Sequence, residues 1–233
     1  LSNERHEAWE TVARKMAHEI KNPLTPIQLT IDRMKNKFSN EIKETDRGNF
    51  EENLKIINNQ IKQIGKLVNE FSDFARMPKP IFKENNLVKI IEDNIKLLRE
   101  LDNTIDISIK YNNKQILLNS DKEQLARVFL NLIKNSIESI QQKEEKNSKI
   151  SKKISIEVND YNNHIMVTII DSGVGFGIIA ENIKDILNPY FTTKKNGTGL
   201  GLSIASKIIN DHNGEIRFIP LDDGAKIKIE FIK

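Results

Sequence analysis

Apolar residues in the first third of the chain recur at steps of three and four, the spacing of one helical face. The first series falls at Trp9, Val12, Met16, Ile20, Leu24, Ile27, Ile31, Met34 and Phe38. The second falls at Phe50, Leu54, Ile57, Ile61, Ile64, Val68, Phe71 and Ala75. Alternating steps of four and three make a heptad seam. We predict an all-α helical hairpin over 1–76, whose polar turn at 39–49 contains Gly48.

A hairpin of two helices has one apolar seam and cannot bury it alone. Two copies that pair as a dimeric four-helix bundle would bury it, and we therefore expect a homodimer. The alternative is that the seam packs against the C-terminal part of the same chain.

The helical pattern stops at Pro78 and Pro80, which lack amide donors and restrict the residues before them. We expect a hinge over 77–82, followed by a second domain over 83–233. There the periodicity predicts helices at 87–101, 121–140, 201–211 and near 181–187. It predicts strands at 105–110, 115–118, 154–159, 164–170, 215–219 and 225–232. Asp121 is a predicted cap, Gly214 a predicted helix end, and the charged stretch 141–153 a predicted loop.

These elements make the second domain α+β, with helices on one face of a mixed sheet. The fold class is thus two domains, a helical hairpin followed by an α+β sandwich.

Composition narrows the function classes. Hydrophobic residues make up 38% and charged residues 30% of the 233 residues, which is typical of a globular protein. A net charge of +3 is too small to favour nucleic acid, and the absence of cysteine excludes thiol chemistry and disulfides. No apolar run approaches the roughly 18–20 residues that span a bilayer. Because the chain begins at Leu1, we expect a cytoplasmic fragment, with any sensory or membrane part lying upstream.

His18 is a candidate nucleophile on the first helix. It lies two residues from Met16 and from Ile20, about 200° around the helix from each, and must point away from the seam. A carboxylate such as the adjacent Glu19, accepting one ring N–H, would leave the other nitrogen free to attack.

Two prolines follow the histidine within the helical pattern. Neither Pro23 nor Pro26 can donate a helical hydrogen bond, so we expect a bend one turn after His18. The alternative, a loop that ends the first helix, is disfavoured because the apolar rhythm resumes at Ile27.

Two segments of the second domain suggest a nucleotide site. Asn131 and Asn135 lie four apart on a predicted helix, with Lys134 between them, and amide oxygens suit Mg²⁺ that bridges phosphates. Asp171 follows an apolar strand and can accept a hydrogen bond from an adenine amino group. The glycines at 173 and 175 would let the backbone approach a flat base. Each motif alone is also compatible with an ordinary surface or turn.

A glycine-rich loop and the segment before it add to this site. The sequence Gly-Thr-Gly-Leu-Gly-Leu-Ser at 197–203 opens a predicted helix, whose amide groups can bind phosphate. It is neither a Walker loop nor a dinucleotide fingerprint. Before it, Tyr190 and Phe191 would anchor a lid, and Lys194 or Lys195 would reach phosphate; simple core packing is the alternative for the two aromatic residues.

Together and in this order, the segments resemble the H, N, G1, F and G2 boxes of sensor histidine kinases, from about Trp9 to Phe231. The resemblance implies an ATP-binding domain of the wider family that includes gyrase, Hsp90 and MutL. It implies that His18 is phosphorylated with Glu19 as activating acid, that Asp171 reads adenine, and that Asn135 holds Mg²⁺ with help from Asn131. The other residues that it assigns to nucleotide and lid are Lys134, Gly173, Gly175, Lys194, Thr198, Gly199, Leu200 and Gly201.

The segment 8–29 is similar to nitrogen-regulation sensors of the NtrY type. This narrower likeness implies an NtrX-like response regulator as partner and a full-length protein anchored in the bacterial inner membrane. Asn22 completes an HExxN pattern that resembles phosphatase-competent members; the alternative is that Asn22 only relieves strain beside Pro23. The chain departs from the common pattern at Ser136, usually alanine, and at Ser172, frequently asparagine.

The function that the resemblance implies is a protein histidine kinase of a two-component system, which uses ATP and Mg²⁺. One alternative is an ATPase or chaperone-like clamp of the wider family. There a glutamate typically activates water where this chain has Asn131, and asparagine cannot take a proton. The other is a non-catalytic dimeric scaffold, which degenerate boxes would favour.

Overall fold

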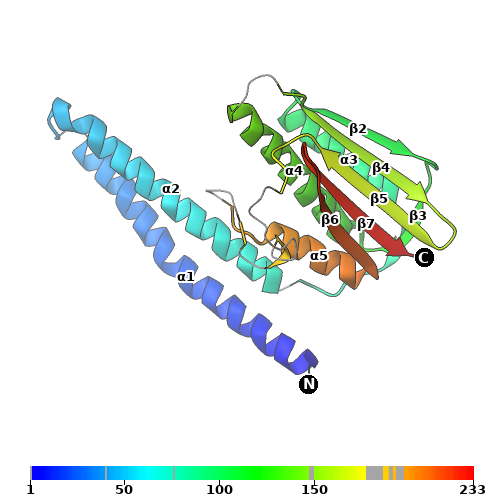
Figure 1. Cartoon of the computed structure of the whole chain (residues 1–233). Coiled ribbons are helices and arrows are strands. Elements are labelled where there is room, and N and C mark those ends of the chain that lie inside the picture. The colour runs from blue at the N-terminus through cyan, green and yellow to red at the C-terminus, as the bar shows by residue number, and fades with distance from the viewer. Residues whose placement is uncertain are drawn as a thin grey trace. The chain divides into compact units, whose positions relative to one another are not determined.

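The computed structural model describes residues 2–39, 41–75, 77–146, 150–176, 186–188, 191–192 and 197–233. It divides into two compact units, one of residues 1–78 with 192–200 and the other of residues 79–191 with 201–233. The division at 78/79 falls inside the predicted hinge. Figure 1 labels the elements of both units.

The first unit contains the two predicted helices, α1 (Ser2–Phe38) and α2 (Glu44–Ala75). The helix α1 continues through Pro23 and Pro26, so the alternative of a loop that ends it there is wrong. The predicted turn was too long, because α2 already begins at Glu44 and includes Gly48. Acidic residues in the first turn of α2 interact favourably with the helix dipole, which explains the early start.

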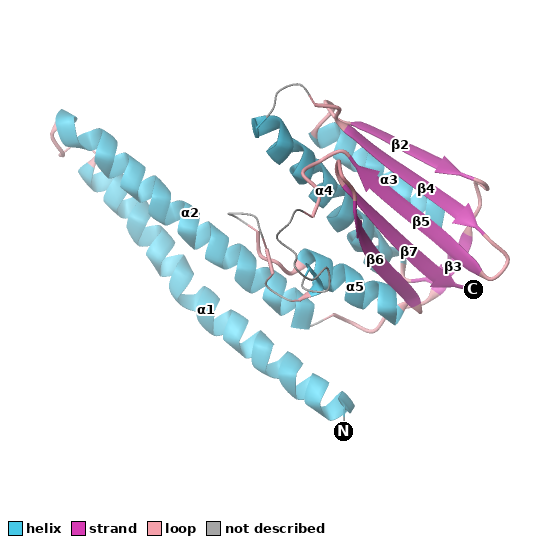
Figure 2. Ribbon diagram, in the orientation of Figure 1, coloured by secondary structure: helices cyan, strands magenta, loops and turns pink. Residues whose placement is uncertain are grey.

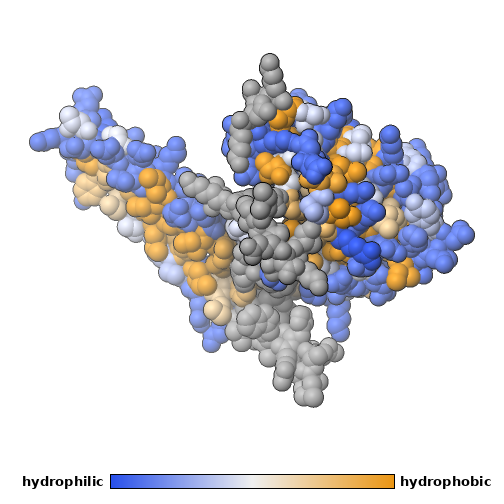
Figure 3. Space-filling view, in the orientation of Figure 1, coloured by the Kyte–Doolittle hydropathy of each residue, from blue (hydrophilic) through white to orange (hydrophobic). Residues whose placement is uncertain are grey.

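The predicted seam divides into two stripes of different burial. One stripe packs α1 against α2 at Ile31, Leu54 and Ile61, with Leu24 and Phe50 partly buried against it. The other stays exposed and comprises Met16, Ile20, Ile27, Met34, Phe38, Ile57 and Ile64. Figure 3 shows apolar side chains gathered along the visible side of the hairpin. Among the seam residues whose side chains the structure describes, four are buried and seven are exposed, so the single chain buries the smaller part of its seam.

The second unit is built on a five-stranded sheet in the order β2-β4-β5-β7-β6, as Figure 2 displays. The strands are β2 (Asp106–Tyr111), β4 (Lys153–Asp160), β5 (His164–Asp171), β6 (Gly214–Pro220) and β7 (Ala225–Ile232). Only the β2–β4 pair is parallel, so the sheet is mixed as predicted. A smaller antiparallel pair joins β1 (Lys83–Asn86), which the sequence did not suggest, to β3 (Leu117–Ser120).

Helices cover one face of the larger sheet. They are α3 (Leu87–Leu101), α4 (Lys122–Lys146) and α5 (Gly201–Asp211). Buried residues alternate along each central strand, as at Ile165, Val167 and Ile169 of β5. This period of two confirms the predicted layer of helices on one side.

The helix α4 differs from its predicted form at one end. Asp121 caps it as expected, because its Oδ1 accepts the amides of Glu123 (3.0 Å) and Gln124 (3.1 Å). The helix then continues to Lys146, so the prediction of a loop from 141 was wrong for its first six residues. Those residues are mostly strong helix formers, and Lys143 forms an ion pair with Asp223.

Three further points concern the predicted ends and linkers. Asn213, with φ 55°, takes the left-handed conformation after α5 that we predicted for Gly214. The amide of Ile81 donates to Asp121 Oδ2 at 2.9 Å, which fastens the second half of the hinge to the cap of α4. Of the predicted short helix at 181–187, only residues 186–187 lie within the described part of the chain. Among the described residues, no helix has the length and apolar character that crossing a bilayer requires.

Candidate functional site

The candidate nucleophile lies on the exposed side of α1. His18 is exposed, whereas its neighbour Ala17 is only 1% exposed. Glu19 and Asn22 are exposed as well, and Asn22 follows His18 by one helical turn. The imidazole therefore faces outward in the single chain, as the spacing predicts, and the two polar residues proposed to act with it share its accessible surface.

Asp171 lies at the end of β5 and points into the layer of helices. It pairs with Ile154 of β4 and Ala225 of β7, residues that belong to the buried face of the sheet. Only 5% of its surface is exposed. A carboxylate at this depth needs hydrogen bonds, because burying an unpaired charge is costly. Asp171 Oδ1 accepts the amide of Gly173 at 2.9 Å, and Oδ2 accepts the hydroxyl of Ser136 at 3.1 Å.

Burial raises the pKa of the Asp171 carboxyl above its ordinary value. The hydrogen bonds from the Gly173 amide, the Ser136 hydroxyl and the Ala225 amide act in the opposite direction, as does the charge of Lys143. A carboxylate with spare lone pairs in a dry position is suited to accept an amino group of a base. Its raised pKa is typical of functional positions, although structural carboxylates share this property.

The loop after β5 needs its glycines for space. A Cβ at Gly173 would overlap the side chain of Ser139 on α4. Gly175 has φ 70°, which favours glycine, and a Cβ there would lie 2.5 Å from the carbonyl oxygen of Gly224. Both glycines are thus required by close packing of the loop itself, whether or not a base also lies against them.

The amide pair on α4 is placed beside this loop. Asn131 and Asn135 are half-buried, and Lys134 is exposed. Ser136, next to Asn135, faces Asp171, so the helix turn that carries the amides is fixed against the sheet. Among the described residues no cluster of three or more His, Cys, Asp or Glu side chains is present. The amide oxygens of Asn131 and Asn135 are hard oxygen ligands of the kind that Mg²⁺ accepts.

The glycine-rich loop is divided between the two units. Gly199 has φ 69°, and Leu200 is fully buried. Thr198 Oγ1 donates to Glu70 of α2 within the first unit. Gly201 begins α5 in the second unit, with open space where a Cβ would be. How this loop surrounds a nucleotide stays a prediction, and Tyr190, Lys194 and Lys195 lie outside the described residues.

Sequence reasoning missed four residues that hold the loop after β5. Lys143 was assigned to a charged loop, Ser139 was not singled out, and Asp223 and Gly224 were expected only as part of the turn between the last two strands. The signal was present in the spacing of Ser136, Ser139 and Lys143, which lie three and four residues apart on one helix face. Ser172 was noted only as a departure, yet its hydroxyl accepts the Lys153 amide at 3.0 Å and anchors the loop to β4.

Two protein families match separate parts of the chain. Residues 8–80 match the family described as "His Kinase A (phospho-acceptor) domain". Residues 120–232 match the family described as "Histidine kinase-, DNA gyrase B-, and HSP90-like ATPase". The first match contains His18, and the second contains Asp171 and the amide pair of α4.

Curated relatives resemble the chain over nearly its whole length. It is 35% identical over 233 residues to "Nitrogen regulation protein NtrY" of Azorhizobium caulinodans, which covers 98% of this chain and 29% of that protein. It is 38% identical over 225 residues to "Putative sensor histidine kinase NtrY-like" of Rickettsia felis, which covers 96% of this chain and 36% of that protein. The chain thus spans about a third of the length of these relatives.

Solved histidine kinase structures match either nearly the whole chain or about two thirds of it. The chain is 27% identical, with a TM-score of 0.67, to a structure described as histidine kinase ThkA in complex with response regulator protein TrrA. That match covers 99% of this chain and 64% of the other. The catalytic domain of ThkA alone is 30% identical with a TM-score of 0.56, and covers 66% of this chain and 96% of that domain.

Proposed function

Because this chain belongs to the sensor histidine kinases, we propose that it moves the γ-phosphoryl group of ATP to its own His18 and then to an aspartate of a response regulator. The observation that carries this function is that one chain contains both an exposed imidazole on α1 and a buried carboxylate at the end of β5. The first is accessible to a phosphoryl donor, and the second can select adenine.

The first step is an in-line attack of a His18 ring nitrogen on the γ-phosphorus of ATP. A P–N bond forms, the bond from phosphorus to the bridging oxygen breaks, and ADP leaves. Glu19 would take the ring proton, a role supported by its position next to His18 on the same exposed stretch of α1. In the second step a regulator carboxylate attacks the same phosphorus, and His18 leaves.

The parts of the chain divide these tasks in our proposal. Residues 1–76 dimerise and accept the phosphoryl group, 77–82 form the hinge, and 83–233 bind ATP. The amide oxygen of Asn135, with Asn131 beside it, would hold Mg²⁺, which offsets charge on the phosphates. Lys134, Lys194, Thr198 and the glycines at 199 and 201 are proposed to contact nucleotide or lid.

The exposed heptad stripe supports the homodimer. Ile20, Ile27 and Met34 of α1 repeat every seven residues, as do Ile57 and Ile64 of α2, and all five are more than a third exposed. A second copy that presents the same stripe would bury it in a four-helix bundle. For the full-length protein we propose an NtrX-like regulator as partner and an anchor in the inner membrane, since the NtrY relatives are about three times longer than this chain.

Asn22 supports a second activity on the regulator. It follows His18 by one turn and is exposed. This position supports a role in which its amide would orient water against a phosphoaspartate docked on the same surface. Asn22→Ala should slow dephosphorylation of the regulator while His18 is still labelled normally. If both reactions fail in this variant, Asn22 has a structural role instead.

Labelling with radioactive ATP tests the kinase. Phosphohistidine is labile in acid and stable in base, so wild-type protein should gain label of that kind, and His18→Gln should gain none. His164→Gln is the control, because His164 is half-buried at the start of β5 and stacks on Tyr161 with ring centres 4.8 Å apart. Undiminished label in His18→Gln would contradict the proposal. ATP hydrolysis without any label would favour the ATPase alternative.

A further inference from the structure

The C-terminal part of α4 lies along the loop that follows β5. Three residues on one helix face each contact it: Ser136 bonds the Asp171 carboxylate, Ser139 O accepts the amide of Val174 at 3.3 Å, and Lys143 Nζ donates to Ser172 O at 2.8 Å. Their spacing of three and four residues makes this face continuous. The loop is therefore held at three successive points, of which Lys143 is the last.

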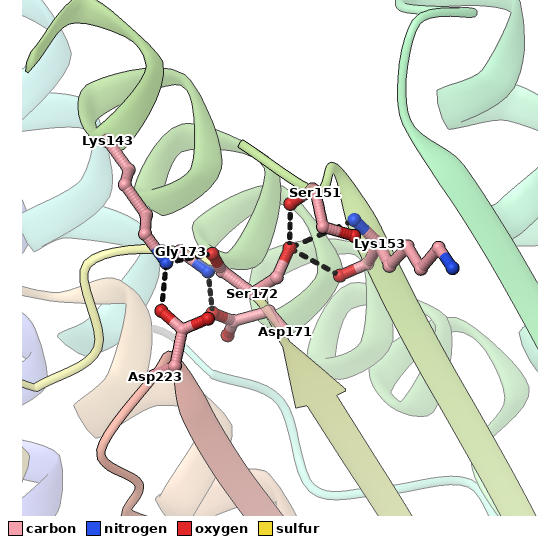
Figure 4. A network of polar contacts seen from close by, with 7 residues as sticks. All are labelled: Lys143, Ser151, Lys153, Asp171, Ser172, Gly173 and Asp223. Atoms are coloured by element: carbon pink, nitrogen blue, oxygen red, sulfur yellow. Dashed lines mark hydrogen bonds and ion pairs between the residues drawn. The ribbon is translucent and has the colours of Figure 1, made fainter. Parts of the chain in front are cut away.

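Lys143 also reaches the turn between β6 and β7. Its ammonium group forms an ion pair with Asp223, as Figure 4 shows together with the contacts of Asp171, Ser172 and Gly173. The next residue, Gly224, has φ 96°, and a Cβ there would overlap the main-chain carbonyl of Asp171. The turn thus touches the main chain of Asp171 directly, and Lys143 joins it to the carbonyl of Ser172.

The geometry favours a positioning function over a contribution to stability. The Asp223 side chain is 75% exposed, and an ion pair with so exposed a partner stabilises a fold little. The Lys143 side chain is only 24% exposed, and its second partner is a main-chain oxygen one residue after Asp171. A charge-assisted bond to a main-chain oxygen orients the peptide that carries it.

We propose that Lys143 is a positioning residue for recognition of the base. It binds both the Ser172 carbonyl, which follows Asp171 in the chain, and Asp223 of the β6–β7 turn, which lies against the Asp171 carbonyl. Lys143 thereby fixes the main chain around Asp171. The Asp171 carboxylate then keeps the orientation in which its free lone pairs meet the amino group of adenine. This inference rests on the proposed function, since it takes Asp171 as the residue that reads adenine.

The test compares adenine with a base that lacks the amino group. We expect Lys143→Met in the 233-residue chain to weaken binding of ADP about tenfold, the scale of one hydrogen bond to a charged group. Binding of IDP, which has a carbonyl at that position, should stay within about twofold, so the preference for adenine falls. Lys143→Arg keeps donors at the same place and should restore most of the preference.

A matched control removes the same charge from a lysine that pairs with another residue of α4. Lys152 pairs with Glu144 at 2.6 Å, and its side chain is also 24% exposed, but that ion pair does not include the loop after β5. Lys152→Met should leave the ADP/IDP preference unchanged. Hydrogen exchange of the Gly173 amide, which donates to Asp171, gives a readout without ligand and should accelerate in Lys143→Met only.

The outcomes separate this inference from the proposed function. Equal losses for ADP and IDP in Lys143→Met would overturn positioning, because they indicate general damage to the pocket. An unchanged ADP/IDP preference of Lys143→Met together with unchanged exchange of the Gly173 amide would overturn positioning as well. The kinase proposal would still stand in that case, provided that the wild-type chain binds ADP. A wild-type chain that fails to prefer ADP over IDP would overturn the assignment of Asp171, and this inference with it.

Discussion

The helical hairpin and the α/β unit bury their apolar residues to different degrees. In the α/β unit the inward residues of the three central strands, such as Ile156, Val167 and Ile229, are fully buried within one chain. In the hairpin Leu54 and Ile61 are buried, but Ile57 and Ile64, which alternate with them, are 45% and 44% exposed. The α/β unit is complete by itself, whereas the hairpin has the pattern of half a core.

The residues proposed for chemistry follow the same difference. His18 is exposed on the incomplete unit, and in the proposed function it would meet two partners in turn, the phosphate of ATP and the aspartate of a regulator. Asp171 is 5% exposed in the complete unit and held by two hydrogen bonds. Rigid packing suits a group that reads one base, and accessibility suits a group that passes a phosphoryl group on.

The largest effect on stability should come from shortening a buried side chain in the core of the α/β unit. Ile169 lies in the middle of β5 and is 1% exposed. We expect Ile169→Ala to lower the free energy of unfolding of the α/β unit by about 2–5 kcal/mol. Its neighbour Ile170 points to the other face of the sheet and is half-buried, so Ile170→Ala should cost clearly less.

Hydrogen exchange of strand amides in denaturant measures this unit separately from the hairpin. Equal losses for Ile169→Ala and Ile170→Ala would contradict the view that one face of the sheet carries the core.

The second effect concerns the missing half of the hairpin core. A charge at Ile64 would be buried without a partner in a four-helix bundle, so Ile64→Glu should weaken dimerisation by on the order of a hundredfold or more. Sedimentation across a concentration series measures the dimer constant. Ile56→Glu is the control, because Ile56 is 51% exposed and lies one residue outside the heptad stripe.

An unchanged dimer constant in Ile64→Glu would contradict the bundle. The alternative, in which the seam packs against the C-terminal part of the same chain, would then be favoured. In that case the charge at Ile64 should lower the stability of the monomer instead of the dimer constant.

The third effect concerns Asp121, where the hinge is fastened to the α/β unit. Burial alone would raise its pKa, but hydrogen bonds from the amides of Ile81, Gln124 and Glu123, with His212 nearby, outweigh it and hold the pKa below the ordinary 3.8. A lowered pKa stabilises the folded state fully above 3.8, and this contribution is lost as pH falls below 3.8 through the folded-state pKa. Asp121→Ala should remove it and cost about 0.5–2 kcal/mol near neutral pH.

Asp121→Asn separates the two tasks of this residue. Asparagine caps a helix about as well as aspartate, but only one of its two terminal atoms is an acceptor, so the bond to the Ile81 amide is lost while the cap remains. We expect Asp121→Asn to retain most of the stability that Asp121→Ala loses. Unfolding free energies measured from pH 6 to pH 3 test both variants. Equal losses of stability in Asp121→Ala and Asp121→Asn would show that the bond to the Ile81 amide, and not the helix cap, provides the stabilisation.

The sequence predicted regular elements best where pattern and end signals agree. The helix α3 has a strict apolar face and an Asn86 cap that accepts the amide of Val88 at 3.1 Å, and its predicted bounds are those observed. The bounds of α5 and β7 were also predicted correctly. Predictions failed where composition was used in place of geometry: Gly48 was read as a turn, and the charged residues after Ile140 as a loop, although both segments are helical.

The candidate site was predictable as residue types and not as contacts. An aspartate after an apolar strand indicated Asp171, but its hydrogen bond to Ser136 depends on how α4 lies on the sheet, which no local pattern contains. Lys143 was missed for the same reason, since its partners Ser172 and Asp223 are 29 and 80 residues away in sequence. Contacts of that range arise from tertiary packing, and single-sequence periodicity does not report them.

The smallest expected effect concerns Ser136, the residue that replaces the common alanine. An ionised carboxylate accepts an amino group more strongly than a protonated carboxyl does. If Asp171 reads adenine, ATP affinity should therefore fall as pH drops toward the pKa of Asp171, which burial raises above 3.8. The Ser136 hydroxyl donates to the carboxylate and opposes that rise. Ser136→Ala should therefore raise the pKa further, and the acid limb of ATP affinity should begin at a higher pH. Ser155→Ala, on the exposed face of β4, should leave the acid limb of ATP affinity at the same pH. If the acid limb also stays at the same pH in Ser136→Ala, the Ser136 hydroxyl does not control the charge of Asp171.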